Sequence, residues 1–129
     1  MAKSYILSID QGTSGTKALI FDGLGNLVSK ASEPLKSYYP FLGYVEQDPN
    51  ELYQNVLTAV GKCYNEFVQS FPAEEKNIIS CGISNQRETF VVWDNFGTPL
   101  HNAVVWQCKR SVAICEELKQ HDLEQMVNA

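Results

Sequence analysis

The sequence predicts an α/β domain in which helices pack on a mixed β-sheet. Three short apolar runs joined by polar or glycine-containing turns come first, and they predict strands that are antiparallel neighbours. A long amphipathic stretch then predicts a helix, and further apolar runs and a second helical pattern follow it. The 129 residues contain no internal repeat or low-complexity segment, so we expect one globular unit with a buried core.

The amino-terminal strands are delimited by turn residues. Residues 5–9 form a compact apolar run that ends in a polar, glycine-containing turn over residues 10–16. Residues 18–21 resume the apolar pattern, residues 22–26 predict another turn, and residues 27–31 predict the third strand. The first strand therefore delivers a carboxylate to the first turn.

A long helix is expected after an irregular excursion over residues 32–47. Asp48 can cap a helix, Pro49 suits its first position, and Glu51 completes a capping box with Asp48. Apolar residues at spacings of three and four then predict a stripe that faces the core: Leu52, Tyr53, Val56, Leu57, Val60, Cys63, Tyr64, Phe67 and Val68. Pro72 ends the helix.

The second half of the chain predicts shorter elements. Residues 78–83 form the next predicted strand, residues 84–89 are a polar hexapeptide, and residues 90–93 predict another strand. Residues 103–106 form a short apolar run. A second helix is expected from the spacing of Val112, Ile114, Cys115 and Leu118. Asp122 can cap a third helix, which the end of the chain interrupts, so we expect the chain to be a fragment.

Charge and hydropathy exclude two classes of partner. The chain has 10 Lys and Arg residues against 15 Asp and Glu residues, and the basic ones are scattered, which argues against nucleic acid. No apolar run approaches the roughly 18 residues of a membrane span, and the amino terminus has no signal-peptide pattern. We therefore expect a cytoplasmic protein without a membrane partner.

The four cysteines form no CxxC pair. They lie in segments predicted to be buried helix or strand: Cys63, Cys81, Cys108 and Cys115. We expect reduced core thiols. A zinc site made of Cys108, Cys115 and His121 is the alternative, but three ligands without zinc-finger spacing argue against it.

The turn after the first strand carries one group of candidate site residues. Glycines in a turn let successive backbone N–H groups point into one concavity that binds anions, and hydroxyl groups and Lys17 add donors. A phosphate group suits such a site, and Asp10 just before it suits the Mg²⁺ that accompanies a nucleotide. The segment is neither a Walker A loop nor a GxGxxG motif. An ordinary hairpin turn of the same composition is the alternative.

A second group of candidates lies in the polar hexapeptide and at Trp106. Arg87 offers five donors and Glu88 offers acceptors, a pairing that suits vicinal hydroxyl groups. Trp106 has a flat apolar face that suits the carbon side of a polyol. The alternatives are a solvated strand edge with a surface ion pair and an aromatic side chain in the core. Arg110 is expected to be a solvated charge at the start of a helix.

Together these motifs resemble the amino-terminal part of the FGGY family of carbohydrate kinases in order and spacing. The matching segments are residues 10–17 (DQGTSGTK), 39–49 (YPFLGYVEQDP), 84–89 (SNQRET) and 105–110 (VWQCKR). The resemblance covers nearly the whole chain and is closest to the branch that phosphorylates glycerol. It implies an actin-like, RNase H-like α/β domain, here incomplete, and ATP-dependent phosphorylation of a polyol or sugar hydroxyl, with glycerol as the expected acceptor and glycerol 3-phosphate as the product.

The resemblance also implies roles for individual residues. Asp10 would help to hold Mg²⁺, and ATP and Mg²⁺ are the expected cofactors. The ATP phosphates would be approached by Gly12, Thr13, Ser14 and Lys17, and the polyol would be bound by Arg87, Glu88 and Trp106. The family's catalytic aspartate lies beyond residue 129, so no catalytic residue is expected in this chain.

The resemblance assigns residues 1–129 to the amino-terminal portion of the first kinase domain, with the second domain outside the chain. The isolated chain is then expected to have little or no activity, and homo-oligomerisation of the complete protein is left open. Lys17 stands where the glycerol-phosphorylating branch carries Arg, and Ser14-Gly15-Thr16 resembles other branches. A kinase for xylulose, ribulose or gluconate is therefore one alternative, and a non-catalytic ATP-binding module is another.

Overall fold

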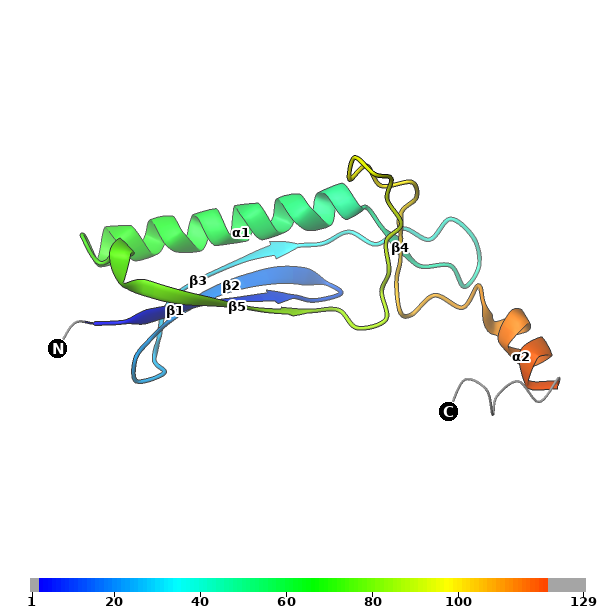
Figure 1. Cartoon of the computed structure of the whole chain (residues 1–129), viewed down its shortest axis with the longest axis horizontal. Coiled ribbons are helices and arrows are strands. Elements are labelled where there is room, and N and C mark those ends of the chain that lie inside the picture. The colour runs from blue at the N-terminus through cyan, green and yellow to red at the C-terminus, as the bar shows by residue number, and fades with distance from the viewer. Residues whose placement is uncertain (1–2, 121–129) are drawn as a thin grey trace.

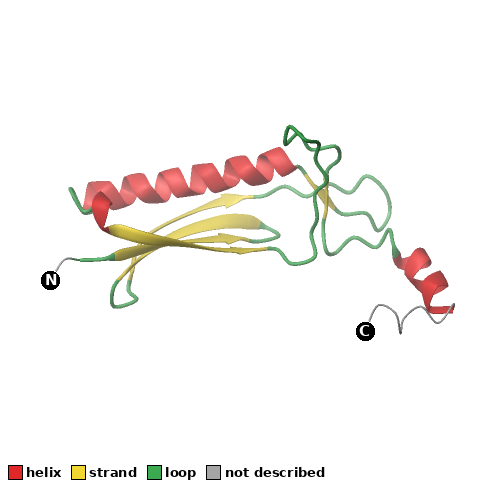
Figure 2. Ribbon diagram, viewed as in Figure 1, coloured by secondary structure: helices red, strands yellow, loops and turns green. Residues whose placement is uncertain are grey.

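The computed structural model describes residues 3–120, which form a sheet covered by one long helix, with a smaller sheet at one end (Figures 1 and 2). The main sheet has the strand order β3-β2-β1-β5. Its strands are β1 (Tyr5–Gln11), β2 (Gly15–Asp22), β3 (Leu27–Pro34) and β5 (Ile78–Asn85). The first three strands form an antiparallel meander, whereas β1 and β5 are parallel. The predicted mixed sheet is therefore confirmed.

The three amino-terminal strands extend beyond the apolar runs that predicted them. Gln11 pairs with Thr16 across the first hairpin, and Gly15 pairs with Pro34 on β3. The predicted turn over residues 10–16 therefore shrinks to residues 12–14. Polar residues can continue a strand because the ladder hydrogen bonds use only backbone groups.

The helix α1 (Pro49–Ser70) begins as predicted but lacks the second half of the capping box. The Asp48 carboxylate accepts a hydrogen bond from the Asn50 N–H at 2.8 Å, which confirms the N-cap. Glu51 instead accepts from the Lys36 N–H at 3.1 Å and from the Tyr38 hydroxyl at 3.3 Å. The irregular excursion that precedes the helix thus lies near the first helical turn, and its donors bind the Glu51 carboxylate in place of the N-cap backbone.

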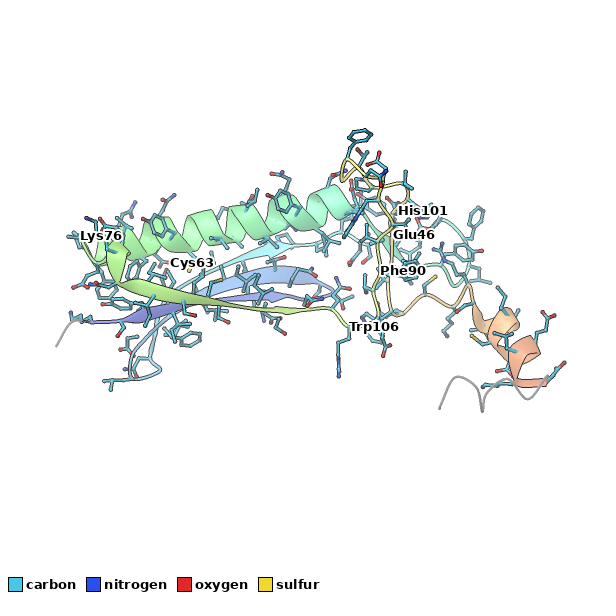
Figure 3. All side chains as sticks on the ribbon, viewed as in Figure 1. Glu46, Cys63, Lys76, Phe90, His101 and Trp106 are labelled. Atoms are coloured by element: carbon cyan, nitrogen blue, oxygen red, sulfur yellow. The ribbon has the colours of Figure 1, made fainter. Side chains whose placement is uncertain are left out.

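The buried face of α1 is narrower than the predicted stripe. Ala59, Cys63 and Phe67 are fully buried against the sheet, and Figure 3 shows Cys63 between the helix and the strands. Three residues of the predicted stripe are exposed: Tyr53, Leu57 and Tyr64. The reason is that α1 packs mainly on β2 and β3, so the flank of the helix toward the other strands stays uncovered. The core forms where Tyr5 meets Phe67 edge-on, with ring centroids 4.8 Å apart.

A second, two-stranded sheet lies beyond the ends of β1 and β5. Its strands are β4 (Glu46–Gln47) and β6 (Ala103–Val104), which pair antiparallel. The predicted strand over residues 90–93 is wrong, because this segment makes only isolated bridges from Phe90 and Trp93. Its neighbours are a small sheet and a turn, which give it no long partner. The helix α2 (Val112–Gln120) is confirmed, whereas the cap predicted at residue 122 lies outside the described residues.

The prediction of core thiols is confirmed for Cys63 and is wrong for the others. Cys81 and Cys115 are exposed and Cys108 is half-buried. Cys81 lies on β5, at the sheet edge that α1 does not cover. Within residues 3–120 no group of three or more metal-binding side chains occurs, and His121 lies outside this range. No helix in the described range is both long enough and apolar enough to span a membrane.

Candidate active site

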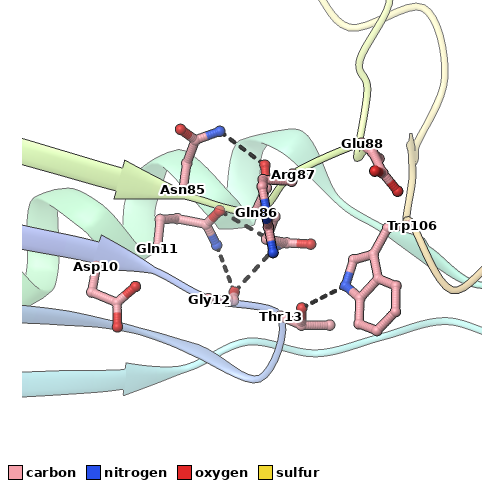
Figure 4. A pocket seen from close by; sticks show the side chains of 9 residues that line it. All are labelled: Asp10, Gln11, Gly12, Thr13, Asn85, Gln86, Arg87, Glu88 and Trp106. Carbon is pink, nitrogen blue, oxygen red and sulfur yellow. Dashed lines mark hydrogen bonds between the residues drawn. The ribbon is translucent and has the colours of Figure 1, made fainter.

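Two adjoining hollows lie at the carboxyl ends of β1 and β5, and they bring the predicted site residues together. The first, of about 470 Å³, is lined by Asp10, Gln11, Gly12, Thr13, Asn85, Gln86, Arg87, Glu88 and Trp106 (Figure 4). The second, of about 420 Å³, is lined by Asp10, Gly12, Ser14, Gly15, Thr16, Lys17, Ser32, Glu33 and Pro34. Asp10 and Gly12 belong to both. The candidate acceptor residues therefore line the first hollow, and Ser14 and Lys17 line the second.

The turn between β1 and β2 differs from the predicted row of free backbone donors. The Gly12 N–H donates to the Gly15 carbonyl at 2.9 Å, so it is used within the hairpin. The Ser14 carbonyl accepts from the Leu35 N–H at 3.0 Å, which ties the turn to the residue after β3. Within residues 3–120 no acceptor is found for the N–H groups of Thr13 and Ser14. The backbone N–H groups of the turn that remain available to a ligand are therefore those of Thr13 and Ser14, and not that of Gly12.

Gly15 is required by close packing of two backbones, which gives a first testable prediction. A Cβ atom at Gly15 would lie 2.6 Å from the Glu33 carbonyl oxygen, so β2 and β3 would have to separate. We expect Gly15→Ala to lower the free energy of unfolding by about 1–3 kcal/mol in a urea titration. The matched control is Gly61→Ala in α1, where a Cβ meets no atom within 4 Å. That control is expected to stabilise the protein by roughly 0.5–1 kcal/mol, and equal effects of the two substitutions would contradict this account.

Asp10 and Lys17 lie on the same face of the sheet. They are directly paired across β1 and β2, and Asp10 is also paired with Ser84 on β5. Directly paired residues on neighbouring strands project to the same side. Both side chains are exposed on the face away from α1. A carboxylate and an ammonium group therefore border the second hollow together.

Arg87 and Glu88 follow β5 and are exposed at the rim of the first hollow. The surface ion pair that was the alternative is not formed, since neither residue takes part in an ion pair within the described part of the chain. Glu88 has a φ of 64°, a left-handed conformation that is uncommon for a residue with a side chain. Such backbone strain gathers at functional sites. The donors of Arg87 and the acceptors of Glu88 are available to a ligand.

Trp106 is 52% exposed, so the alternative of an aromatic side chain in the core is wrong. Its indole Nε1–H donates to the Thr13 hydroxyl at 2.9 Å, as Figure 4 shows. Its backbone N–H donates to the Thr89 hydroxyl at 3.2 Å. The indole N–H is thus hydrogen-bonded to the turn between β1 and β2, and Trp106 can offer only the flat face of its ring to a ligand.

Two buried glutamines at the site were missed in the sequence. Gln47 is 0% exposed and Gln86 is 8% exposed, and their side chains are joined by a hydrogen bond of 2.9 Å. Gln86 lies in the polar hexapeptide, which the sequence had marked as a candidate binding segment, so its position could have indicated a role at the site. Gln47 is the last residue of the irregular excursion, where no periodicity marked it as buried.

Arg110 was expected to be a solvated charge, and this is wrong. Its guanidinium group donates to the buried Glu46 carboxylate at 2.6 Å and lies 4.2 Å from the centre of the Tyr44 ring. Burial raises the pKa of Glu46, but hydrogen bonds from Arg110 and Asn102 outweigh burial and hold this pKa below its ordinary value. The pair fixes the small sheet that carries Gln47 next to the site.

Comparisons with known proteins show which family and which solved structures this chain resembles. Residues 5–129 match the N-terminal domain of the FGGY family of carbohydrate kinases. Glycerol kinase 1 of Thermotoga maritima is 45% identical over 121 residues, which cover 93% of this chain and 24% of that protein. The crystal structure of Plasmodium falciparum glycerol kinase with ADP is 32% identical with a TM-score of 0.70, covering 89% of this chain and 22% of that one. That of a "xyloylose kinase" from Brucella ovis is 30% identical with a TM-score of 0.78, covering 92% and 24%.

These similarities decide the fold and the family. The agreement of this chain with these two solved kinase structures confirms the predicted actin-like α/β fold. The chain spans about a quarter (24%) of the length of the curated relatives it matches. It therefore belongs, through an N-terminal domain, to the FGGY family of carbohydrate kinases, which are phosphotransferases.

Proposed function

We propose that this chain is the amino-terminal portion of the first domain of an ATP-dependent kinase that converts glycerol to glycerol 3-phosphate. The observation that carries the proposal is the shared wall of the two hollows. Asp10 and Gly12 lie between a hollow with free hydroxyl and ammonium groups and a hollow with Arg87 and an aromatic face. Two adjoining sites, one for phosphates and one for a polyol, are what phosphoryl transfer requires.

The residues of the second hollow suit the phosphate groups of ATP. Ser14 supplies a hydroxyl group and a backbone N–H group, and Lys17 supplies a point charge on the same face as Asp10. Thr13, which lines the first hollow, adds its own hydroxyl and backbone N–H groups. Hydrogen bonds and positive charge of this kind neutralise the charge that spreads over the transferring group. The chain itself thus binds and orients the phosphate donor, and the catalytic base is expected from residues outside the chain.

The chemistry of Asp10 fits a magnesium ion. Its carboxylate is exposed and lines both hollows, and within residues 3–120 it belongs to no group of three or more metal-binding side chains. Mg²⁺ is commonly held by one or two carboxylates together with water and the phosphates of the substrate. When bound there, such an ion would supply positive charge that stabilises the transferring phosphate group. Asp10 would hold it, directly or through water.

The first hollow supports a polyol as the acceptor. Arg87 can donate to two adjacent hydroxyl groups, Glu88 can accept from them, and the exposed face of Trp106 can cover the carbon side of the molecule. Lys17 and the segment Ser14-Gly15-Thr16 resemble other branches of the family, which makes a pentulose or a sugar acid the second candidate for the acceptor. Glycerol is preferred because Arg87, Glu88 and Trp106, which match the glycerol-phosphorylating branch, are the residues that would contact the acceptor.

Removal of Arg87 is expected to weaken acceptor binding selectively. In the complete protein, meaning the product of the uninterrupted reading frame that contains this chain, Arg87→Ala should raise the KM for glycerol about 10- to 100-fold, because charged hydrogen bonds contribute about 1.5–3 kcal/mol. The KM for ATP should change little. The control is Lys76→Ala, an exposed charge at the opposite end of the sheet (Figure 3). Equal increases in both KM values would contradict the role given to Arg87.

An assay of acceptors tests the proposal itself. MgATP-dependent phosphorylation of glycerol, xylulose, ribulose and gluconate is measured for this chain and for the complete protein. We expect turnover of glycerol by the complete protein and little or none by the chain alone. Faster turnover of xylulose, ribulose or gluconate would identify that compound, in place of glycerol, as the acceptor. ATP binding without turnover of any acceptor would leave a nucleotide-binding module.

A further inference from the structure

Five residues form a closed ring of side-chain and backbone hydrogen bonds between the two halves of the site: Thr13, Gln47, Gln86, Thr89 and Trp106. Gln47 Nε2 donates to the Thr13 carbonyl at 2.7 Å, and Gln86 Nε2 donates to Gln47 Oε1 at 2.9 Å. The Thr89 hydroxyl donates to Gln86 Oε1 at 2.9 Å. Trp106 closes the ring, because its backbone N–H donates to Thr89 and its indole N–H donates to the Thr13 hydroxyl.

The two glutamines hold successive carbonyl groups of the turn. Gln47 binds the carbonyl of Thr13, and Gln86 Nε2 lies 3.3 Å from the carbonyl oxygen of Gly12. Gln11 Nε2 also donates to the Gly12 carbonyl, at 2.9 Å (Figure 4). Both carbonyl groups are therefore turned toward buried amides rather than toward the hollows.

The orientation of these carbonyl groups fixes the neighbouring N–H groups. The described chain has no cis peptide bond, and in a trans peptide the C=O and the N–H of one unit point in opposite directions. The carbonyl of Gly12 shares its peptide unit with the N–H of Thr13, and the carbonyl of Thr13 shares one with the N–H of Ser14. These two N–H groups consequently point away from the glutamines, and Thr13 and Ser14 line the hollows.

We propose that Gln47 and Gln86 are positioning residues that aim the Thr13 and Ser14 N–H groups at the phosphate groups of the nucleotide; this inference rests on the proposed function. Neither glutamine needs to touch the nucleotide. Their effect is to prevent the two peptide units from rotating, so that the donors are in place before the phosphates arrive. Preorganised donors bind an anion more tightly than donors that must first reorient.

The other half of the ring positions the acceptor side. Thr89 links Gln86 to the backbone of Trp106, whose ring face is offered to the polyol. Gln47 is thus connected directly to the phosphate turn, Thr89 is connected directly to Trp106, and Gln86 is connected to both. The three residues should therefore affect the two substrates differently.

The test compares Gln47→Met, Thr89→Val and Gln86→Met in the complete protein. Each change keeps approximate size and removes the ring's hydrogen bonds. We expect Gln47→Met to raise the KM for ATP about tenfold and to change the KM for glycerol less than twofold. Thr89→Val should show the opposite pattern, and Gln86→Met should raise both constants. If Gln47→Met does not fold, Gln47→Glu takes its place, since it keeps the length and the acceptor but lacks the donor.

A binding measurement separates this inference from the proposed function. Calorimetric titration with ADP should give about a tenfold larger Kd for Gln47→Met than for the unsubstituted protein, whether or not glycerol is turned over. The control is Gln54→Met, the same change at an exposed position of α1, which should leave the Kd unchanged. Thermal midpoints show which variants are folded.

The outcomes differ for the two ideas. Equal changes in both KM values for Gln47→Met and Thr89→Val, or changes within twofold for both variants, would overturn the positioning role. Turnover of no acceptor by the unsubstituted protein, together with weaker ADP binding by Gln47→Met, would remove the kinase function and keep the positioning role. Failure of the unsubstituted protein to bind ADP would overturn both.

Discussion

Asp10→Asn is expected to lower kcat by about 100- to 1,000-fold in the complete protein, the range observed when one preorganised electrostatic contact at a transferring group is lost. The substitution keeps the size and shape of the side chain and removes only its negative charge. A neutral amide is a poor ligand for Mg²⁺, which prefers charged oxygen atoms. Because the carboxylate is exposed at the end of β1, the fold should be unaffected.

The dependence of the rate on Mg²⁺ distinguishes a metal ligand from a structural residue. For Asp10→Asn the Mg²⁺ concentration that gives half-maximal activity should rise, and excess Mg²⁺ should recover part of the lost rate. The control is Asp94→Asn in an exposed turn, where the side chain accepts the N–H groups of Phe96 and Thr98 at 2.9 Å and Asn can do the same. An unchanged Mg²⁺ requirement for Asp10→Asn would remove Asp10 from the metal site.

The fold was predictable where the sequence carries local signals. Asp48 and Pro49 marked the start of α1 to the residue, and short turns indicated the antiparallel meander. The errors occurred where tertiary contacts decide. Glu51 bonds to the excursion rather than to the cap. Residues 90–93 have the composition of a strand but lie beside partners too short to form a ladder.

The site was predictable as a set of motifs but not as a network. Arg87 and Glu88 were singled out because charged side chains after an apolar strand are a visible pattern, and the structure brings them to Asp10 and Gly12. Gln47 carried no such signal, because a buried amide differs from an exposed one only through its partners, which lie far away in the sequence. For the same reason the sequence did not indicate that Arg110 pairs with Glu46, 64 residues away.

The Arg110–Glu46 pair leads to the largest expected effect on stability. Arg110→Met keeps most of the length of the side chain and removes the charge. The Glu46 side chain is 8% exposed, so its carboxylate would remain buried with the Asn102 amide at 3.1 Å and the exposed His101 ring at 3.9 Å. Removing one partner of a buried ion pair costs about 3–5 kcal/mol. We expect a loss of this size in the free energy of unfolding at pH 7, measured by urea titration.

The pH dependence of that loss identifies its cause. In the unsubstituted protein the pKa of Glu46 is lowered below its ordinary value of 4.5, so its stabilising contribution is present above that pH and is lost as the pH falls through the lowered pKa. Without Arg110, burial should raise the pKa of Glu46, and protonation then favours the folded state. The difference between the two proteins should therefore shrink from pH 7 to pH 4, whereas a loss of packing alone would not depend on pH. Adding Glu46→Gln to Arg110→Met removes the unpaired charge and should recover part of the stability at pH 7, which ties the loss to that carboxylate.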